Sequence, residues 1–367
     1  MNIDPLFRPL TVKNMKLPNR IVMAPMTRYF SPGGVPTDEV VEYYRRRAAG
    51  GTGLILSEGT AVDRPFAVSD PDIPHFYGKD ALAGWKKVID AVHGAGACMG
   101  PQLWHAATLY NTQRGCGYID RLESPSGLVM KDSPVGVVMS GEDIEDAIAS
   151  FARCAAAAKA LGFDCIEIHA GHGYLVDQFF WEDTNQRDDE FGGSTLAERT
   201  RFATEVIRAI RKAVGENFVI GIRLSQWKQQ DYTVRLANSP QDMEAWLGPM
   251  ADAGVDIFHC SQRRFWEPEF EDSDLNFAGW AKKLTGKVTT TVGSVGLKND
   301  FLRSFTTGEV AAPADVHEVV ERLERGEYDL VAVGRALIGD PEWANKIKTG
   351  RFDELSGFDT GNLGTLA

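Results

Sequence analysis

Eight short apolar segments, each followed by a stretch long enough for a helix, restrict the fold of this chain more than any other feature. Near-continuous hydrophobicity of this kind is typical of parallel strands that are covered on both faces. The segments are residues 20–25, 53–59, 98–105, 165–170, 219–224, 257–262, 288–293 and 330–335. Because strands and helices alternate, we expect a parallel sheet with right-handed connections.

Eight such units in a chain of 367 residues favour a closed (β/α)8 TIM barrel over an open, doubly wound sheet. An open sheet usually carries a G-x-G-x-x-G motif after its first strand, whereas the first strand here leads into the sequence APMTR (24–28). We expect residues 1–367 to form one domain, with residues 1–18 closing the bottom of the barrel as a hairpin. The long stretch 106–140 after the third strand is rich in Gly, Pro and Ser, so we expect a lid or flap there.

Several connecting segments have clear helical patterns. Ser140 with Asp143 forms a variant of the capping box, which predicts a helix that ends near Gly162. Residues 196–214 and 313–325 are also amphipathic, and the second of these segments begins with a proline, which suits a first helical turn.

The composition limits the binding partners and the cellular location that we expect for this chain. The net charge is -12 and no basic stripe is present, so neither nucleic acid nor an anionic membrane surface is expected as a partner. No stretch approaches roughly 18 consecutive apolar residues and no leader pattern begins the chain, so we expect neither a membrane span nor secretion. The five cysteines are widely spaced and lack a C-x-x-C pair, which argues against a zinc ribbon or an iron–sulfur cluster and favours the cytoplasm.

The end of the fourth predicted strand carries the most informative residues. His169, His172 and Tyr174 bring two imidazoles and a phenol within six residues, and the C-terminal ends of the strands are where the chemistry of a barrel lies. Two N–H donors can hold a carbonyl oxygen while a phenol delivers a proton to the carbon beside it. Few other reactions need that combination.

The remaining strand ends favour a site for a flat heterocycle with a phosphate tail. Gly293 and Arg335 follow the seventh and eighth strands, where barrels often bind phosphate, although glycine and arginine after a strand also occur in ordinary turns. Gln102 suits an amide-like edge of the ring, Arg223 suits a developing negative charge, and Thr27 suits a carbonyl oxygen. Taken one at a time, each of these residues could have a purely structural role, but together they indicate a binding site for such a heterocycle.

Several longer motifs also occur in a fixed order along the chain. They are NRIVMAPMTR (19–28), QLWHA (102–106), EIHAGHGYLVDQF (167–179) and NQR (185–187) with GGS (192–194). Together they resemble the Old Yellow Enzyme family, whose members are FMN-dependent ene-reductases built on a (β/α)8 barrel. The similarity runs from about residue 5 to about residue 351 and matches the single-domain form of the family.

The resemblance implies FMN as cofactor, NADPH or NADH as reductant, and reduction of the activated C=C bond of an α,β-unsaturated carbonyl or a related nitro or aromatic compound. It implies that His169 and His172 bind the carbonyl oxygen and that Tyr174, with an ordinary pKa of about 10, donates the proton. Hydride would leave flavin N5, and both half-reactions would share one face of the ring in ping-pong kinetics. The positions implied to contact the flavin are Pro25, Met26, Thr27, Gly59, Gln102, Arg223, Gly293, Ser294, Gly334 and Arg335. We further predict that Trp104 and Trp266 contact the substrate.

Other interpretations of these residues stay open at this point. His169 and His172 would suit a metal if His105 or Glu167 supplied a third ligand. A flavin-free barrel lyase would need a Schiff-base lysine or metal carboxylates at the strand ends, and no lysine is found there. An intact Tyr174 argues against a non-catalytic flavoprotein sensor, whereas a dehydrogenase or demethylase of the same family fits the same residues. The oligomeric state is left open, and a homodimer is one option.

Overall fold

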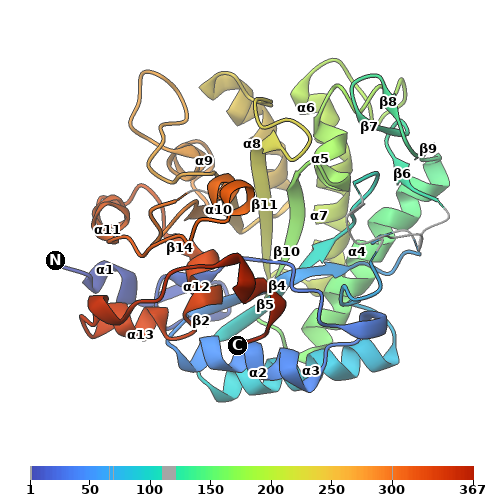
Figure 1. The fold of residues 1–367 in the computed structure, drawn as a ribbon. Helices are drawn as coiled ribbons and strands as arrows, with labels where there is room; N and C mark the ends of the chain where they lie inside the picture. The colour runs from blue at the N-terminus through green and yellow to red at the C-terminus, as the bar shows by residue number, and fades with distance from the viewer. Residues whose placement is uncertain (1, 66, 69, 110–120, 300) are drawn as a thin grey trace.

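The computed structural model describes residues 2–65, 67–68, 70–109, 121–299 and 301–367. Eight parallel strands close into a barrel in the order β10-β11-β12-β13-β14-β3-β4-β5, with helices around it (Figure 1). The predicted (β/α)8 barrel is therefore confirmed. The barrel strands are β3 (Ile21–Met23), β4 (Leu54–Ala61), β5 (Cys98–Trp104), β10 (Cys165–His172), β11 (Val219–Lys228), β12 (Ile257–Ser261), β13 (Val288–Val292) and β14 (Leu330–Val333).

Two strands extend further toward the mouth of the barrel than predicted. β10 continues to His172 instead of ending at residue 170, and β11 continues to Lys228 instead of ending at residue 224. Parallel pairing persists to the new ends, where His172 is the partner of Lys228. Since side chains alternate along a strand, Arg223 and Trp227 lie on the same face of β11.

Helices surround the barrel, and the helix predicted from the capping box is confirmed. It begins after Ser140, whose side chain and that of Asp143 close the box, and it ends at Gly162 with a left-handed φ of 93°. The longer helices are α2 (Asp38–Ala49), α3 (Lys79–Gly94), α4 (Gly141–Leu161), α7 (Arg201–Val214), α8 (Pro240–Ala253), α9 (Phe277–Thr285) and α11 (His317–Glu324). The shorter ones are α1 (Asp4–Phe7), α5 (Leu175–Phe180), α6 (Leu196–Arg199), α10 (Phe301–Thr307), α12 (Arg335–Gly339) and α13 (Trp343–Lys348), with 3-10 turns η1 (Pro32–Gly34), η3 (Phe352–Glu354) and η4 (Thr360–Gly364).

The prediction of one continuous helix over residues 196–214 was wrong. The segment forms α6 and α7, which are separated at Thr200. The hydroxyl of Thr200 donates to the carbonyl of Ala197 at 2.6 Å, and a hydroxyl that bonds to the backbone in this way competes with the regular helical pattern. Periodicity alone does not register this competition.

The helix predicted over residues 313–325 also begins later, at His317. Pro313 is instead part of an antiparallel bridge with Leu297. The backbone around it is extended because the neighbouring peptides exchange hydrogen bonds with residues 296 and 298. The proline therefore lies in a strand-like segment and does not open the helix.

The N-terminal hairpin is confirmed. β1 (Leu10–Val12) and β2 (Met15–Leu17) pair in antiparallel fashion. Their buried side chains pack in one apolar cluster with residues from the first positions of several barrel strands. Lys13 forms an ion pair of 2.9 Å with Asp256 in the loop before β12. The hairpin therefore closes the end of the barrel opposite the mouth.

The predicted lid or flap at residues 106–140 contains two small sheets in its described part, and residues 110–120 lie outside the described residues. β6 (Glu123–Ser124) pairs in parallel with β9 (Val137–Val138), and β7 (Leu128–Met130) pairs in antiparallel fashion with β8 (Ser133–Pro134). These sheets follow β5 directly in the chain and lead into α4 (Figure 1).

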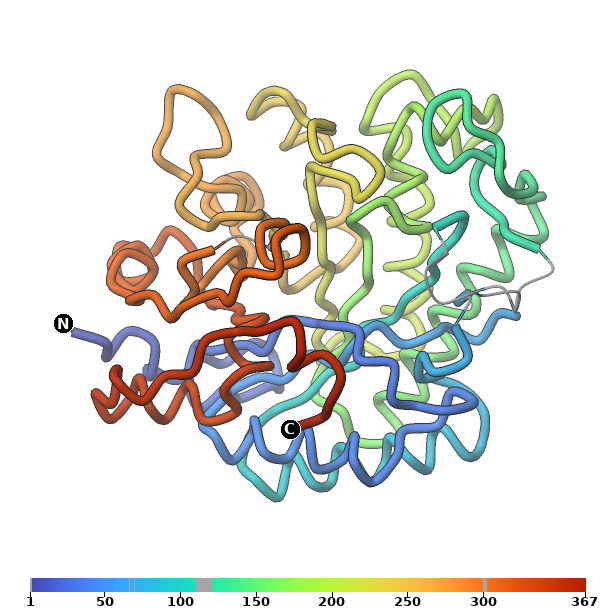
Figure 2. The backbone as a smooth tube through the Cα atoms, in the orientation of Figure 1, coloured from blue at the N-terminus to red at the C-terminus, as the bar shows by residue number. Residues whose placement is uncertain are grey.

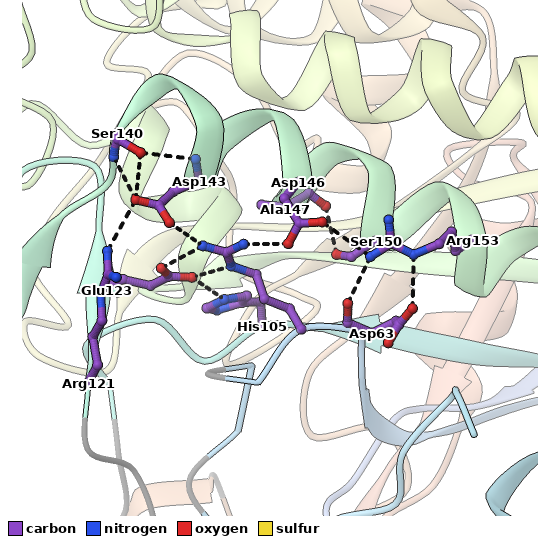
Figure 3. A network of polar contacts seen from close by, with 11 residues as sticks. Asp63, His105, Arg121, Glu123, Ser140, Asp143, Asp146, Ala147, Ser150 and Arg153 are labelled. Atoms are coloured by element: carbon purple, nitrogen blue, oxygen red, sulfur yellow. Dashed lines mark hydrogen bonds and ion pairs between the residues drawn. The ribbon is translucent and has the colours of Figure 1, made fainter. Parts of the chain in front are cut away.

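A buried ion cluster, which we call the stem clamp, fixes this flap to the barrel (Figure 3). Glu123 is 0% exposed and accepts hydrogen bonds from Arg64 Nε at 2.5 Å and from His105 Nε2 at 3.1 Å. Arg64 also pairs with Asp143 at 2.9 Å and with Asp146 at 2.5 Å on α4. Burial alone would raise the pKa of Glu123, but the bonds from Arg64 and His105 lower it to about 2.

The C-terminal segment returns across the barrel and ends beside α2 (Figure 2). Arg47 Nη2 donates to the carbonyl of Ala367 at 2.9 Å, and Arg28 Nη2 donates to that of Thr365 at 2.6 Å. These bonds hold the segment over the barrel, where Phe358 contributes to the cavity described below. In the described part of the chain, no helix has the length and apolar character needed to cross a membrane.

Candidate active site

A cavity of about 460 Å³ opens at the C-terminal ends of the barrel strands. This volume lies in the usual range for small-molecule sites, roughly 300–1,000 Å³. All ten residues predicted to contact a flavin line it, together with His169, His172, Tyr174 and Trp104. The barrel thus brings residues from eight distant segments into one ring, although their roles stay predictions.

The two histidines and the tyrosine converge at the end of β10. The ring centroids of His169 and His172 lie 5.1 Å apart at an interplanar angle of 88°, and those of His169 and Tyr174 lie 4.8 Å apart at 72°. His172 Nε2 is 2.8 Å from Ser261 Oγ, whereas His169 Nδ1 is buried and has no hydrogen-bond partner among the described residues. A buried polar atom without a partner is uncommon, and it indicates that this imidazole is arranged to meet a bound group.

Both imidazoles are held in the neutral form. Desolvation, followed by the positive charge of Arg223, holds the pKa of His169 well below its usual value, and the same two causes act on the pKa of His172. A neutral imidazole keeps one N–H donor and one acceptor. Each ring can therefore donate one hydrogen bond to an oxygen in the cavity.

Tyr174 does not have the ordinary pKa that we predicted. Desolvation raises the pKa of its phenol to about 12, even though a hydrogen bond with Gln229 opposes the shift. The phenol is therefore more firmly protonated at neutral pH than the prediction assumed. Trp104 packs edge-on against it, with centroids 4.9 Å apart at 77°.

A wall of stacked rings adds residues that the sequence did not reveal. Trp227 stacks on His172 with centroids 4.4 Å apart at 16°, and Tyr232 stacks on Trp227 at 5.2 Å and 21°. The strand was predicted to end at residue 224, before Trp227. Its alternation with Arg223 was the signal that could have placed it at the mouth. Other lining residues that were not predicted are Tyr29, Gln229, Tyr232 and Ser261.

The substrate contact predicted for Trp266 stays a prediction, although its side chain lies away from the described cavity. Trp266 is not among the residues that line the cavity. Its ring packs edge-on against Phe265, with centroids 5.1 Å apart at 90°, and it contributes to the main apolar core. A loop position after β12 is therefore not sufficient to bring a side chain into the mouth.

Polar residues on β5 and β11, the two strands that pair with β10, fit a flat heterocycle. Gln102 Nε2 donates to Glu167 at 2.8 Å, which leaves its amide oxygen to accept a bond from a ring N–H. Arg223 is buried, and its Nε has no hydrogen-bond partner in the part of the chain that the structure describes. A buried guanidinium with an unused N–H is suited to an electron-rich ring edge on which negative charge develops.

The segment after β13 and the start of α12 fit a phosphate. Gly293 has φ 137°, and a Cβ at this position would lie 2.7 Å from the carbonyl oxygen of Gln262, so only glycine fits. Ser294 follows with φ 55°. Arg335 is oriented by its bonds to Ser304 Oγ at 2.9 Å and to the carbonyl of Asn299 at 2.8 Å. The residues present therefore suit a flavin mononucleotide.

The ligands considered for a metal are engaged elsewhere. His105 Nε2 contacts Glu123 in the stem clamp. Glu167 bonds to Gln102 through one oxygen and accepts the Nδ1–H of His259 at 2.7 Å through the other. Among the described residues, no group of three or more His, Cys, Asp or Glu side chains could hold a metal ion.

Comparison with known proteins gives consistent relatives. The sequence profile described as the NADH:flavin oxidoreductase / NADH oxidase family matches residues 5–354. The chain is 38% identical to 12-oxophytodienoate reductase 7 of Oryza sativa subsp. japonica over 94% of this chain and 88% of that protein. It is 30% identical to NADPH dehydrogenase of Bacillus subtilis over 92% and 93% of the two chains.

Two further matches concern length and fold. The chain is 31% identical to NADH oxidase of Thermoanaerobacter brockii over 98% of its own length but spans only 53% of that protein. The structure of morphinone reductase in complex with tetrahydroNAD superposes with a TM-score of 0.79 and 26% identity, covering 98% of this chain and 93% of that one.

Proposed function

This chain belongs to the NADH:flavin oxidoreductase / NADH oxidase family, the Old Yellow Enzyme family, and we propose that it is an NAD(P)H-dependent ene-reductase. FMN is its cofactor and a nicotinamide nucleotide is its reductant. The reaction that we propose is reduction of the activated C=C bond of an α,β-unsaturated carbonyl or a related nitro or aromatic compound. The convergence of His169, His172 and Tyr174 on one cavity is the observation that carries this proposal.

The flavin would be held by the residues that fit it above. When bound, FMN supplies a hydride to the β-carbon of the acceptor. Thr27, Gln102 and Arg223 would hold the ring, and Gly293, Ser294 and Arg335 would hold the phosphate, with the remaining contacts from Pro25, Met26, Gly59 and Gly334.

His169 and His172 would hold the carbonyl oxygen of the acceptor. Negative charge builds on this oxygen as the C=C bond is reduced, and each neutral imidazole can donate one N–H to it. The gain is largest where charge develops, and losing one such donor typically costs on the order of 2.7–4 kcal/mol. The pair would therefore stabilise the transition state more than the ground state.

Tyr174 would deliver the proton to the α-carbon. Its raised pKa of about 12 keeps the phenol protonated throughout the physiological range. The phenol would release its proton only to a strongly basic centre such as an enolate carbon, and solvent would restore it afterwards. Trp104, edge-on to the phenol, limits the directions in which the ring can turn.

The lining of the cavity narrows the class of acceptor. Within the described part of the chain no Asp or Glu lines the cavity, whereas Arg263, which is not assigned to the flavin, does. Trp104, Trp227 and Tyr232 contribute aromatic surface. We therefore propose a planar acceptor that is neutral or anionic, since a cationic acceptor would meet like charge.

The test is the colour and redox behaviour of the purified protein. We expect a yellow protein whose absorption bleaches with NADPH or NADH under anaerobic conditions and recovers on addition of cyclohexenone. Bleaching without recovery by any enone or nitro-olefin would favour a dehydrogenase or demethylase of the same family. A colourless protein that does not take up added FMN would overturn the proposal.

Three broader expectations complete the proposal. One FMN-binding domain would span residues 1–367, because the barrel and its C-terminal segment share the cavity. A cytoplasmic location would suit the four described cysteines, which are all unpaired. A homodimer is the oligomeric state to test first, by light scattering.

A further inference from the structure

An ion pair between Asp177 and Lys228 is completely buried beside the turn that carries His172 and Tyr174. Lys228 Nζ lies 2.6 Å from Asp177 Oδ1, and both side chains are 0% exposed. The second carboxylate oxygen, Oδ2, accepts the backbone N–H of Gly173 at 2.6 Å. One carboxylate therefore joins the end of β11 to the peptide that links the two candidate catalytic side chains.

The turn held by this carboxylate has an unfavourable backbone. His172 has φ 65°, which is uncommon for a residue other than glycine, and Gly173 follows with φ 85°. The N–H of His172 donates to Ser225 Oγ on β11 at 2.8 Å. Two consecutive N–H groups are thus anchored, and such a backbone persists only where the surroundings hold it.

Stability alone explains this ion pair poorly. Neither Asp177 nor Lys228 lines the cavity. Burial raises the pKa of Asp177 and lowers that of Lys228, so the surroundings disfavour the charge on each. An apolar pair of similar volume is often as stable as a buried ion pair, or more stable. An apolar pair, however, has no oxygen to accept the N–H of Gly173.

We propose that Asp177 and Lys228 are positioning residues for the reduction of the acceptor. Lys228 holds the carboxylate of Asp177 in place, and the carboxylate holds Gly173, which sets the directions of the His172 and Tyr174 side chains. The reaction that the pair affects depends on the proposed function, whereas the geometry of the turn does not. The pair has a role in the oxidation of the flavin by the acceptor.

Two double variants that differ at one side chain test the proposal. Asp177→Leu/Lys228→Met removes both charges and the acceptor of the Gly173 N–H, whereas Asp177→Asn/Lys228→Met removes both charges but keeps an oxygen there. We expect the first variant to reoxidise with an enone at least ten-fold more slowly and to bind phenol at least ten-fold more weakly. The second should recover most of both losses.

A matched ion pair at the other end of the barrel provides the control. Asp329 accepts Lys282 Nζ at 2.8 Å and the N–H of Thr289 at 3.1 Å, which is the same pattern of bonds in a partly exposed pair far from the mouth. We expect Asp329→Leu/Lys282→Met to alter the melting temperature without changing phenol affinity or reoxidation. Equal phenol affinity and reoxidation in the wild type and in folded Asp177→Leu/Lys228→Met would overturn the inference.

Hydrogen exchange of the wild-type protein covers the case in which the variants do not fold. We expect the Gly173 amide to exchange as slowly as the amides of β10, and exchange at the rate of an exposed loop would overturn the inference. The proposed function has its own, earlier test in the wild type. If the wild type fails to reduce any enone, the function fails, whereas phenol binding and hydrogen exchange still report on the turn.

Discussion

The stem clamp and the mouth of the barrel are both buried polar clusters, yet their polar atoms are used differently. In the stem clamp, Arg64 and Glu123 bond to each other, and His105 accepts the N–H of Ala107 at Nδ1 while contacting Glu123 through Nε2. At the mouth, His169 Nδ1 and Arg223 Nε are buried without a hydrogen-bond partner among the described residues.

This difference in hydrogen bonding distinguishes a structural cluster from a binding site. Buried polar groups in folded proteins are nearly always paired, and a cluster that satisfies itself needs no ligand. The stem clamp is such a cluster, and it ties the flap to α4. The mouth leaves donors unused, which is costly unless a bound group satisfies them. Satisfied hydrogen bonding, and not burial or charge, distinguishes the two regions.

The largest effect is expected at the mouth from Tyr174→Phe. Removing a positioned general acid should slow reoxidation of the flavin by an enone by about 10²–10⁴-fold. Reduction by NADPH needs no proton from this phenol and should stay nearly intact. Anaerobic stopped-flow absorption resolves the two half-reactions, and equal slowing of both would remove Tyr174 as the proton donor.

The stem clamp should respond in stability instead. Glu123→Gln leaves the buried guanidinium of Arg64 with one charged partner fewer, and breaking a buried pair from one side typically costs about 3–5 kcal/mol. Urea unfolding measures the loss, and turnover per bound flavin should be retained. A variant of native stability with poor turnover would instead make Glu123 part of the active site.

His172→Ala should weaken phenol binding about 10- to 100-fold, because a hydrogen bond to a charged group contributes roughly 1.5–3 kcal/mol. The long-wavelength charge-transfer band of the complex should weaken with it. His317→Ala, on the exposed face of α11, is the control. Unchanged phenol affinity in His172→Ala would show that this ring does not hold the oxygen.

The sequence was sufficient for the barrel and for most of the mouth because strand order in a closed barrel determines which residues meet. Apolar segments separated by helix-length stretches specify eight strands, and their C-terminal ends then form one ring. No distance information is needed to bring Gln102 close to Arg223.

Other features required the three-dimensional structure. The stem clamp joins Arg64 from a loop, Glu123 from β6 and Asp143 from the start of α4, and no periodic pattern connects such positions. Trp227 was missed because β11 stays paired to Lys228 beyond its apolar segment. The packing of Trp266 on the core could not be predicted, because a loop sequence does not say whether a ring turns inward or packs on the core.

Two buried glutamates, one beside the mouth and one in the stem clamp, have pKa values shifted in opposite directions. Glu58 lies on β4, where its Oε2 accepts the N–H of Arg28 at 2.8 Å. Burial raises its pKa to about 7, against the effect of the Arg28 bond. In the stem clamp, the bonds from Arg64 and His105 overcome burial and lower the pKa of Glu123 to about 2.

The signs of the two contributions to stability therefore differ. An unfolded glutamate titrates near pKa 4.3. Glu123, with a depressed pKa, stabilises the fold above about pH 4, and this contribution is lost as the pH falls toward 2. Glu58, with a raised pKa, binds its proton more tightly in the folded state, so its contribution is present at low pH and is lost as the pH rises through 7.

Glu58→Gln should change the free energy of unfolding by the smallest amount of these variants. The sign of its pH dependence is the clearest. The amide oxygen can still accept the N–H of Arg28, and no charge is buried above pH 7. We therefore expect the variant to match the wild type at pH 5 and to exceed it at pH 8 by on the order of 1–3 kcal/mol, since one pKa unit corresponds to about 1.36 kcal/mol. Thermal unfolding at the two pH values measures the difference. A gain of equal size at both would mean that Glu58 does not titrate in this range, and that the carboxyl beside the mouth is as fully satisfied as the one in the stem clamp.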